Sequence, residues 1–325
     1  MITQIMKKYF LLLIFPLVLI SCNGKSEIEK EIENVEVGEV KIVRFDDVFY
    51  NSKPEDLPKL KEAYPYFFPQ NFPDSVWVNN MNDPFMRQLK EETDKEFAKF
   101  NTLEADLESA FKHMKYYFND FSTPEVFTII SDNENQRAVY SPEVVAIPIN
   151  LYLGKDNKLY DGLPSYQVQT FEPNQIVPDV VSSFATDYIA PPKNRTFLAL
   201  IVYFGKELYM KDVIIPNATD AVKMGYTDEQ ELWAEENESE IWRYFIENKV
   251  LFDTDAKLAS RFVNPAPFSK FYLELDNESP GRLGVWMGWQ IVRAYMENNK
   301  DVTLQNLLNT DAKTIFDNSK YKPKK

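Results

Sequence analysis

Two residue types that carry much of protein chemistry occur once each in this chain of 325 residues: the cysteine Cys22 and the histidine His113. A single cysteine cannot form an internal disulfide, and a single histidine excludes most metal and acid/base sites. A Ser-His-Asp or Cys-His arrangement would have to use His113. We place His113 on the polar boundary of an amphipathic helix and predict that it is exposed on the surface.

Carboxylates are the other groups that could act as acid, base or metal ligand. Asp and Glu number 50, and their densest cluster, Glu235, Glu236, Glu238 and Glu240, lies on a helix predicted at 228–248. We interpret this cluster as a solvated acidic face, and a calcium site or a pair of glycosidase carboxylates stays open as the alternative. The nine glycines are widely spaced, and neither a Gly-x-Ser-x-Gly turn nor a Gly-rich phosphate loop occurs.

The segment before Cys22 has the features of a secretory signal. Lys7 and Lys8 form a basic region, and a continuous apolar stretch follows at 10–20. This stretch is too short to cross a bilayer, because a transmembrane helix needs roughly 20 apolar residues. We predict that residues 1–21 are a signal peptide.

The residues Leu19-Ile20-Ser21-Cys22 resemble the bacterial lipobox, in which the cysteine carries the lipid and becomes the first residue of the mature chain. Acyl chains on Cys22 would anchor the protein in a membrane. An incidental cysteine after an ordinary signal peptide and an uncleaved anchor are the alternatives. Residues 22–34 then form the lipidated N-terminus and a flexible tether. Since Asn23 is not the Asp associated with inner-membrane retention, we expect the outer membrane.

Composition restricts the class of protein and of partner. Hydrophobic residues make up 44% and aromatic residues 14% of the chain, which predicts a folded protein rather than a disordered one. The formal net charge is -14 and no basic patch occurs. An acidic surface repels the nucleic-acid backbone, so we expect no nucleic-acid partner. The length allows one large globular domain, which we place at 35–325.

The first half of this domain is predicted to mix helices with a few strands. Apolar residues alternate in two phases around Gly38, which predicts a bulge at this glycine. Pro148 favours an edge position for its strand, and Asp83 with Pro84 has the residue types of a helix start. The predicted elements are a strand at 35–43, helices at 54–63, 84–100 and from about 101, a Pro- and Phe-rich connection at 64–84, and strands at 125–130 and 144–153.

The second half is predicted to be almost wholly helical. Thr227 and Gln230 fit a capping box at the start of a long helix. The fold class is therefore mainly α with a small β element. The predicted helices are 178–189, 195–213, 228–248, 255–262, 268–275 and 283–298, with short helices to about 319.

The predicted helix 195–213 is apolar around nearly its whole first half, which is typical of the centre of a fold. Gly205 interrupts it and indicates close backbone packing or an ancestral site. Lys206 lies in a mostly buried turn and should need a carboxylate partner, for which Glu240 is a candidate.

The segment 279–295 holds three of the nine glycines. Gly284 and Gly288 are four residues apart and form a smooth stripe on which another helix can lie close. Trp286 and Trp289 flank this stripe, and we interpret them as core residues.

Five segments of the sequence together resemble the gliding-motility lipoprotein B family (GldB) of the Bacteroidetes. They are the lipobox at 19–22, Arg44-Phe45-Asp46, the Pro- and Phe-rich stretch 64–73, the helix end 205–209 and the segment 279–295. The resemblance implies an envelope lipoprotein required for gliding motility and linked protein secretion. It also implies membrane contact through the lipid and partners among the envelope proteins of that machinery.

That family is in turn similar to a group of zinc peptidases whose buried helix carries His-Glu-x-x-His, with a downstream Glu as a further ligand. On this sequence the first His falls on Gly205 and the catalytic Glu on Lys206. The second His falls on Tyr209, and the downstream ligand on Glu240. Three of these positions lack the chemistry that zinc hydrolysis needs. The similarity implies a degenerate zincin-like, gluzincin-related fold that acts as a pseudo-peptidase, with no enzyme activity, metal or cofactor.

Two other functions stay open from the residues alone. One is an active peptidase or glycosidase that uses carboxylates. The other is a lipoprotein that binds peptides or glycans, which the aromatic content favours.

Overall fold

The computed structural model of this chain describes residues 27–274 and 276–324. The chain divides into an N-terminal unit that ends at Asn34 and a compact unit, Val35–Lys325. In the N-terminal unit the structure describes one helix, α1 (Glu27–Glu33). The predicted signal peptide and the lipidated Cys22 lie outside the described residues.

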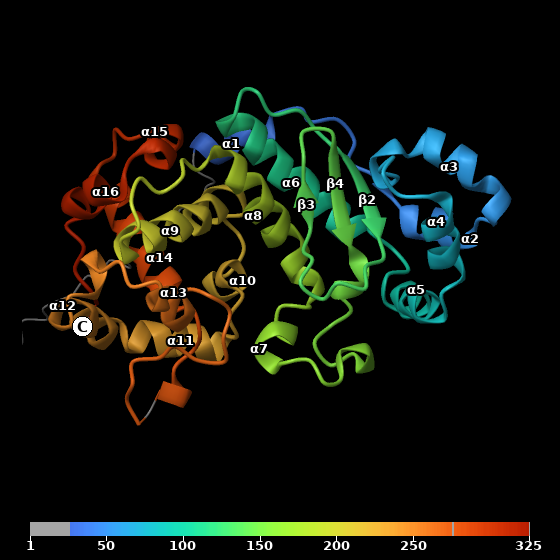
Figure 1. Ribbon diagram of the computed structural model, residues 1–325. Helices are drawn as coiled ribbons and strands as arrows, with labels where there is room; N and C mark the ends of the chain where they lie inside the picture. Colours follow the sequence, from blue (N-terminus) through green and yellow to red (C-terminus); the bar gives the residue numbers. More distant parts are fainter. Residues whose placement is uncertain (1–26, 275, 325) are drawn as a thin grey trace, which may run out of the picture. The chain divides into compact units, whose positions relative to one another are not determined.

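A small sheet runs through the large unit with strand order β1-β2-β4-β3, in which β3 is antiparallel to β4 and the other neighbours are parallel (Figure 1). The predicted strand 35–43 is wrong in length: only Ile42 and Val43 pair, and Gly38 lies before them with a φ of 77°. The predicted edge position of Pro148 is also wrong. Its strand, β4, lies between β2 and β3. A proline is tolerated in this inner strand because Pro148 is its last residue, where no inner hydrogen bond of the sheet is lost. The strands are β1 (Ile42–Val43), β2 (Glu125–Ile129), β3 (Val139–Tyr140) and β4 (Val144–Pro148).

Four short helices near the start of the large unit form a separate aromatic core with Phe127 and Val144 of the sheet. The predicted start at Asp83 is confirmed, since its carboxylate accepts hydrogen bonds from the next helix's backbone N–H groups, those of Phe85 and Met86. That helix ends earlier than predicted, at Glu96. The four helices are α2 (Phe45–Asn51), α3 (Leu57–Ala63), α4 (Asp74–Asn82) and α5 (Pro84–Glu96).

The main core lies among longer helices, of which α9 and α14 pack most extensively on each other. Glycine makes this possible: a Cβ on Gly288 would overlap the carbonyl oxygen of Ile201, and one on Gly205 would overlap the backbone of Gly288. The predictions of a smooth glycine stripe and of buried Trp286 and Trp289 are therefore confirmed. The long helices are α6 (Asn101–Tyr117), α8 (Ile176–Tyr188), α9 (Phe197–Ile214) and α14 (Leu283–Asn298).

Shorter elements complete the large unit (Figure 1). They are α7 (Ser165–Val168), α10 (Asp220–Met224), α11 (Asp228–Glu236), α12 (Glu238–Glu247), α13 (Lys257–Phe262), α15 (Leu304–Asn309) and α16 (Ala312–Ser319). Short 3-10 turns join them: η1 (Pro54–Asp56), η2 (Pro65–Phe67), η3 (Ile149–Leu151), η4 (Lys158–Tyr160), η5 (Pro173–Gln175), η6 (Val250–Phe252) and η7 (Asp276–Glu278).

Two helix predictions in this half need correction. The predicted helix 228–248 is two helices that meet at Asn237, although its capping box is confirmed. No α-helix forms over the described part of 268–275. There the backbone bonds to distant residues, because the Ser269 N–H donates to Pro280 O and the Lys270 N–H donates to Arg261 O.

The predicted fold class is confirmed: the protein is mainly helical with one small four-stranded sheet and a single compact domain. Within residues 27–274 and 276–324, no helix combines the length and apolar character that a bilayer crossing requires.

Candidate functional site

Two residues of the predicted degenerate site, Gly205 and Tyr209, lie one turn apart on α9, whereas Lys206 and Glu240 have partners elsewhere. Gly205 faces the backbone of α14. Lys206 points elsewhere, and its Nζ donates to the carbonyl oxygens of Leu308 at 2.9 Å and Thr310 at 2.6 Å. These carbonyls lie at the C-terminal end of α15, where helix geometry leaves oxygens without intrahelical partners. Burial lowers the pKa of Lys206 to about 8.

The predicted pairing of Lys206 with Glu240 is wrong. Glu240 is exposed and forms a two-pronged ion pair with Arg243 on its own helix, with N–O distances of 2.6 and 2.7 Å. Tyr209 is partly buried against the main core, and burial raises the pKa of its phenol. Lys206 and Glu240 therefore have separate surroundings.

His113 is buried, with 5% of its surface exposed, so the prediction of a surface histidine is wrong. Its Nδ1 lies 2.8 Å from the carbonyl oxygen of Ser109, one turn earlier on α6. This hydrogen bond within the helix allows the ring to be buried at the boundary of the apolar face.

The acidic cluster is mostly a solvated face, as predicted, since Glu235, Glu236 and Glu240 are exposed. Glu238 departs from this: it is 3% exposed and accepts a hydrogen bond from the Tyr321 hydroxyl. In the part of the chain that the structure describes, no group of three or more His, Cys, Asp or Glu side chains has the arrangement of a metal site.

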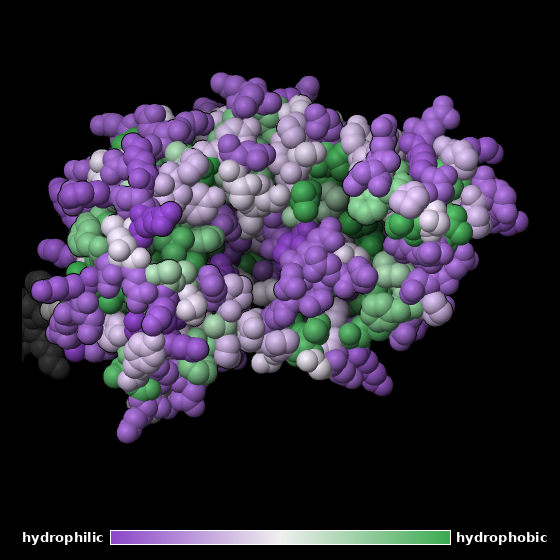
Figure 2. Space-filling model, in the orientation of Figure 1, coloured by the Kyte–Doolittle hydropathy of each residue, from purple (hydrophilic) through white to green (hydrophobic). Residues whose placement is uncertain are grey.

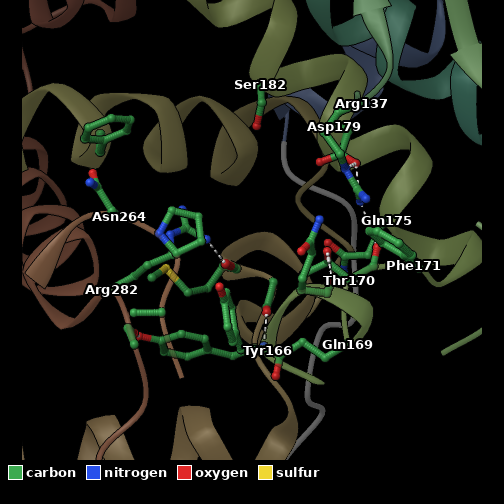
Figure 3. A pocket seen from close by; sticks show the side chains of 18 of the residues that line it. Arg137, Tyr166, Gln169, Thr170, Phe171, Gln175, Asp179, Ser182, Asn264 and Arg282 are labelled. Carbon is green, nitrogen blue, oxygen red and sulfur yellow. Dashed lines mark hydrogen bonds and ion pairs between the residues drawn. The ribbon is translucent and has the colours of Figure 1, made fainter. Parts of the chain in front are cut away.

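A polar cleft of about 600 Å³ is the strongest candidate site. Figure 2 shows the hollow in this face of the large unit, and Figure 3 shows the side chains that converge on it. Helix α9 contributes Phe204, Glu207 and Lys211, which lie on one face at i, i+3 and i+7. The other walls come from residues 134–137, 166–171, α8, 224–226, 263–266 and 281–282.

One wall of the cleft is the ion pair of Arg137 and Asp179, beside which Phe171 lies (Figure 3). Arg137 Nε and Nη2 lie 2.7 and 2.6 Å from Asp179 Oδ2. The Tyr152 hydroxyl donates to the same oxygen at 2.8 Å. The guanidinium of Arg137 lies 4.8 Å from the ring centre of Tyr152 and 5.3 Å from that of Phe171. Asp179 is thus neutralised and fixed by groups of the protein itself.

The second wall is the polar face of α9. Glu207 Oε1 accepts a hydrogen bond of 2.7 Å from Ser182 Oγ on α8. Lys211, one turn further on, is 7% exposed, and its Nζ donates to the backbone oxygen of Lys223 at 3.0 Å. No described carboxylate oxygen lies within 4 Å of this ammonium, and burial lowers the pKa of Lys211.

The third wall is the turn that precedes α14. Arg282 has a left-handed backbone with φ of 60°, and its Nη1 donates to the carbonyl oxygen of Met224 at 2.9 Å. Gly281 beside it passes so close to Ala266 that a Cβ would overlap the Ala266 carbonyl. The Tyr226 hydroxyl also donates to the Gly281 carbonyl. These contacts fix the Arg282 side chain in the cleft, where Figure 3 shows it between Asn264 and the Arg137–Asp179 pair.

The floor is held by side-chain amides. Gln169 Nε2 donates to Gly225 O at 2.9 Å and to Gln230 Oε1 at 3.0 Å, and Gln175 Nε2 donates to Val222 O at 3.1 Å. Sequence reasoning did not single out any of these cleft residues. The one visible signal was Lys211, a lysine on a helix predicted to be largely buried.

The match to a family of known proteins covers nearly the whole chain. The family model described as gliding motility protein GldB matches residues 25–323. No curated protein and no solved structure gives a significant match. A match of this extent shows that the chain belongs to the GldB family and is a gliding-motility-related lipoprotein of the cell envelope.

Proposed function

We propose that this protein acts without catalysis, as a lipid-anchored scaffold of the outer membrane that holds a segment of a partner envelope protein in the polar cleft. The hydrogen bonds of two cleft carboxylates, Asp179 and Glu207, support this proposal. Asp179 is bound by Arg137 and Tyr152, and Glu207 accepts from Ser182. A general acid or base has to exchange a proton with a substrate, whereas these groups are engaged in contacts between separate segments of the fold.

The lining of the cleft is suited to a polypeptide. Asn264 is exposed at its rim and Tyr166 is partly exposed. Side-chain amides and phenols can donate to and accept from the main chain of an extended segment. The volume of about 600 Å³ lies within the usual range for binding sites, so the cleft has room for a few residues rather than a whole domain.

Site-specific photo-crosslinking in native envelopes tests the partner. A photoreactive amino acid at Asn264 should crosslink one defined protein, and the same group at Glu55, which is exposed and does not line the cleft, should not. The same adducts from both positions, or none from Asn264, would contradict a partner in the cleft.

The absence of catalysis is tested with Glu207→Gln, which removes the carboxylate while its amide oxygen can still accept from Ser182. We expect the purified protein to hydrolyse no peptide either with or without this substitution. A peptide-hydrolysing activity of the purified protein that is lost in Glu207→Gln would overturn the proposal.

The lipid anchor is tested separately. Cys22→Ser should move the protein from the membrane fraction to the soluble fraction after cell lysis, because a thioether-linked lipid cannot form on serine. Retention of Cys22→Ser in the membrane fraction would favour an uncleaved anchor.

A further inference from the structure

The cleft holds two cations, Lys211 and Arg282, that form no ion pair within 4 Å among the described residues. We propose that Lys211 and Arg282 together bind a carboxylate group, carried by a peptide that enters the cleft. This inference rests on the proposed function, in which the cleft receives a segment of another protein, and it names the chemistry by which that segment is recognised.

The local charge leaves room for one anion. Arg137 and Asp179 neutralise each other, and Glu134 is exposed at the rim, where solvent screens it. Among the described residues that line the cleft, Glu207 is then the one carboxylate left to offset the charges of Lys211 and Arg282. The interior of the cleft therefore has one excess positive charge, although the chain as a whole carries -14.

The ammonium of Lys211 is the first observation that indicates a missing anionic partner. An ammonium that leaves water needs a carboxylate or several acceptors to replace its hydration. Lys211 has one backbone acceptor, at 3.0 Å, and within the described residues no carboxylate oxygen lies within 4 Å. Lys206 on the same helix is also buried, and it has two carbonyl acceptors. The ammonium of Lys211 has donors left for a ligand.

Arg282 supplies the second, independent observation. Its left-handed backbone is unfavourable for any residue with a Cβ, and glycine would adopt it at no steric cost. Such an outlier suggests that the side chain is needed where it stands. Among the described residues, its guanidinium donates one N–H group, to Met224 O. The others form the planar fork that binds carboxylates in a two-pronged way.

A carboxylate fits this site better than a phosphate group does. A monoanion matches the single excess charge, whereas a phosphate of nearly two negative charges would be repelled by Glu207. The carboxylate could come from the C-terminus of the partner or from an acidic side chain, and the test separates these sources.

The test measures binding of short peptides to the full-length lipoprotein in nanodiscs by NMR or calorimetry. The probes are acetyl-trialanine with a free C-terminus, the same peptide as its amide, and acetyl-Ala-Glu-Ala-amide. At least one of the two carboxylate probes should bind and the uncharged amide should not. Binding of acetyl-trialanine with its free C-terminus indicates a C-terminal carboxylate, and binding of acetyl-Ala-Glu-Ala-amide indicates an acidic side chain. Equal binding of the amide, or no binding of either carboxylate probe, would overturn the inference.

Three variants locate the site without depending on an unstable protein. Arg282→Gly keeps the left-handed turn, and Lys211→Met keeps the volume of the side chain, so both should fold. Each should weaken carboxylate binding by about tenfold or more. Glu207→Gln should strengthen binding, because it removes the competing anion. Lys249→Gly is the matched control: Lys249 has the same left-handed backbone, with φ of 55°, and does not line the cleft.

The outcomes also distinguish this inference from the proposed function. If Lys211→Met and Arg282→Gly bind the probes like the wild type, the proposal that these two residues bind a carboxylate is wrong. If crosslinking from Asn264 persists in both variants while the probes do not bind, the cleft still receives a partner, and only its recognition by charge is wrong. If the probes bind and no partner crosslinks from Asn264, the proposed function fails and the carboxylate site stands.

Discussion

Two charged clusters lie beside each other along α9, and they are built in opposite ways. Asp212 belongs to the first cluster, in which its carboxylate bonds to Arg293 and Lys223, and Arg293 also bonds to Asp220. Its neighbour in sequence, Lys211, belongs to the cleft and has no carboxylate within 4 Å among the described residues. A cluster whose charges are all paired stabilises the fold, whereas one with an unpaired charge is prepared for a ligand.

The paired cluster ties α9 to α14. Arg293 makes two-pronged contacts to both aspartates, with N–O distances of 2.5 to 2.9 Å. Its guanidinium lies 3.6 Å from the ring centre of Trp289, whose Nε1 donates to Asp212 at 2.8 Å. Two cations and two anions satisfy one another here, which is the condition under which buried charges are tolerated.

The largest effect should follow from Asp212→Ala. It leaves Arg293, Lys223 and the Trp289 N–H without their shared acceptor, and removal of one partner from a buried network costs about 3–5 kcal/mol. Denaturant unfolding measures this loss. Asp317→Ala, which breaks an exposed pair with Lys313, should change the free energy of unfolding by less than about 1 kcal/mol. A similarly small effect of both substitutions would show that the paired cluster does not stabilise the fold as described.

A pH effect of intermediate size should come from Glu231, which lies beside the paired cluster but has no cation bound to it. Its Oε1 accepts from Trp286 Nε1 at 3.1 Å, and its Oε2 is buried without a described partner. Burial raises the pKa of Glu231 to about 7, with a smaller contribution from Asp220 and Glu235 and an opposing one from Arg293. The folded protein therefore holds this proton more tightly than the unfolded chain.

The stabilising contribution of this proton is fully present below the unfolded pKa near 4.5 and is lost as the pH rises through about 7. We expect the free energy of unfolding to fall by about 2–3 kcal/mol from this group between pH 4.5 and pH 8. Glu231→Gln keeps an acceptor for Trp286. Between the same two pH values, its free energy of unfolding should fall by about 2–3 kcal/mol less than that of the wild type. Unfolding curves at several pH values measure the difference, and parallel behaviour of both proteins would disprove it.

The smallest effects should separate the two lysines of α9. Lys206→Met leaves the Thr310 carbonyl oxygen without this donor and the Leu308 carbonyl oxygen with the Ala190 N–H alone, and it should destabilise the fold by about 1–2 kcal/mol. Lys211→Met removes a poorly paired buried charge and should be neutral or stabilising by about 1 kcal/mol. Thermal unfolding of both variants checks the opposite signs. A loss of stability in Lys211→Met as large as in Lys206→Met would mean that Lys211 is structural.

Much of the fold follows from local sequence patterns. The predicted helix 195–213 is observed as Phe197–Ile214, and the predicted 283–298 has the same bounds in the structure. Both are long and carry strong signals at their ends or along one face. One failure has its cause in long-range hydrogen bonds. The segment 268–275 is not helical, because its backbone bonds to residues 261 and 280.

The candidate site could be predicted only in small part. The face of α9 that lines the cleft is Phe204, Glu207 and Lys211, whereas the positions expected from the zinc-peptidase resemblance are Gly205, Lys206 and Tyr209. A helix that is apolar on nearly all sides has no periodic pattern to indicate which side faces a cleft. Arg282 carries no sequence signal either, since the preceding Pro-Gly marks a turn without showing which backbone conformation follows.

The sequence by itself determined the helical class of the fold, the close helix packing at the glycine stripe of 284 and 288, and membership of a lipoprotein family. These depend on local periodicity, on residue size and on the order of segments along the chain. Only the tertiary structure decided which charges are satisfied. Lys206 finds its acceptors more than 100 residues further on, and Lys211 finds one carbonyl and an open cleft. Whether a buried charge is structural or available to a ligand depends on the groups that other elements bring to it.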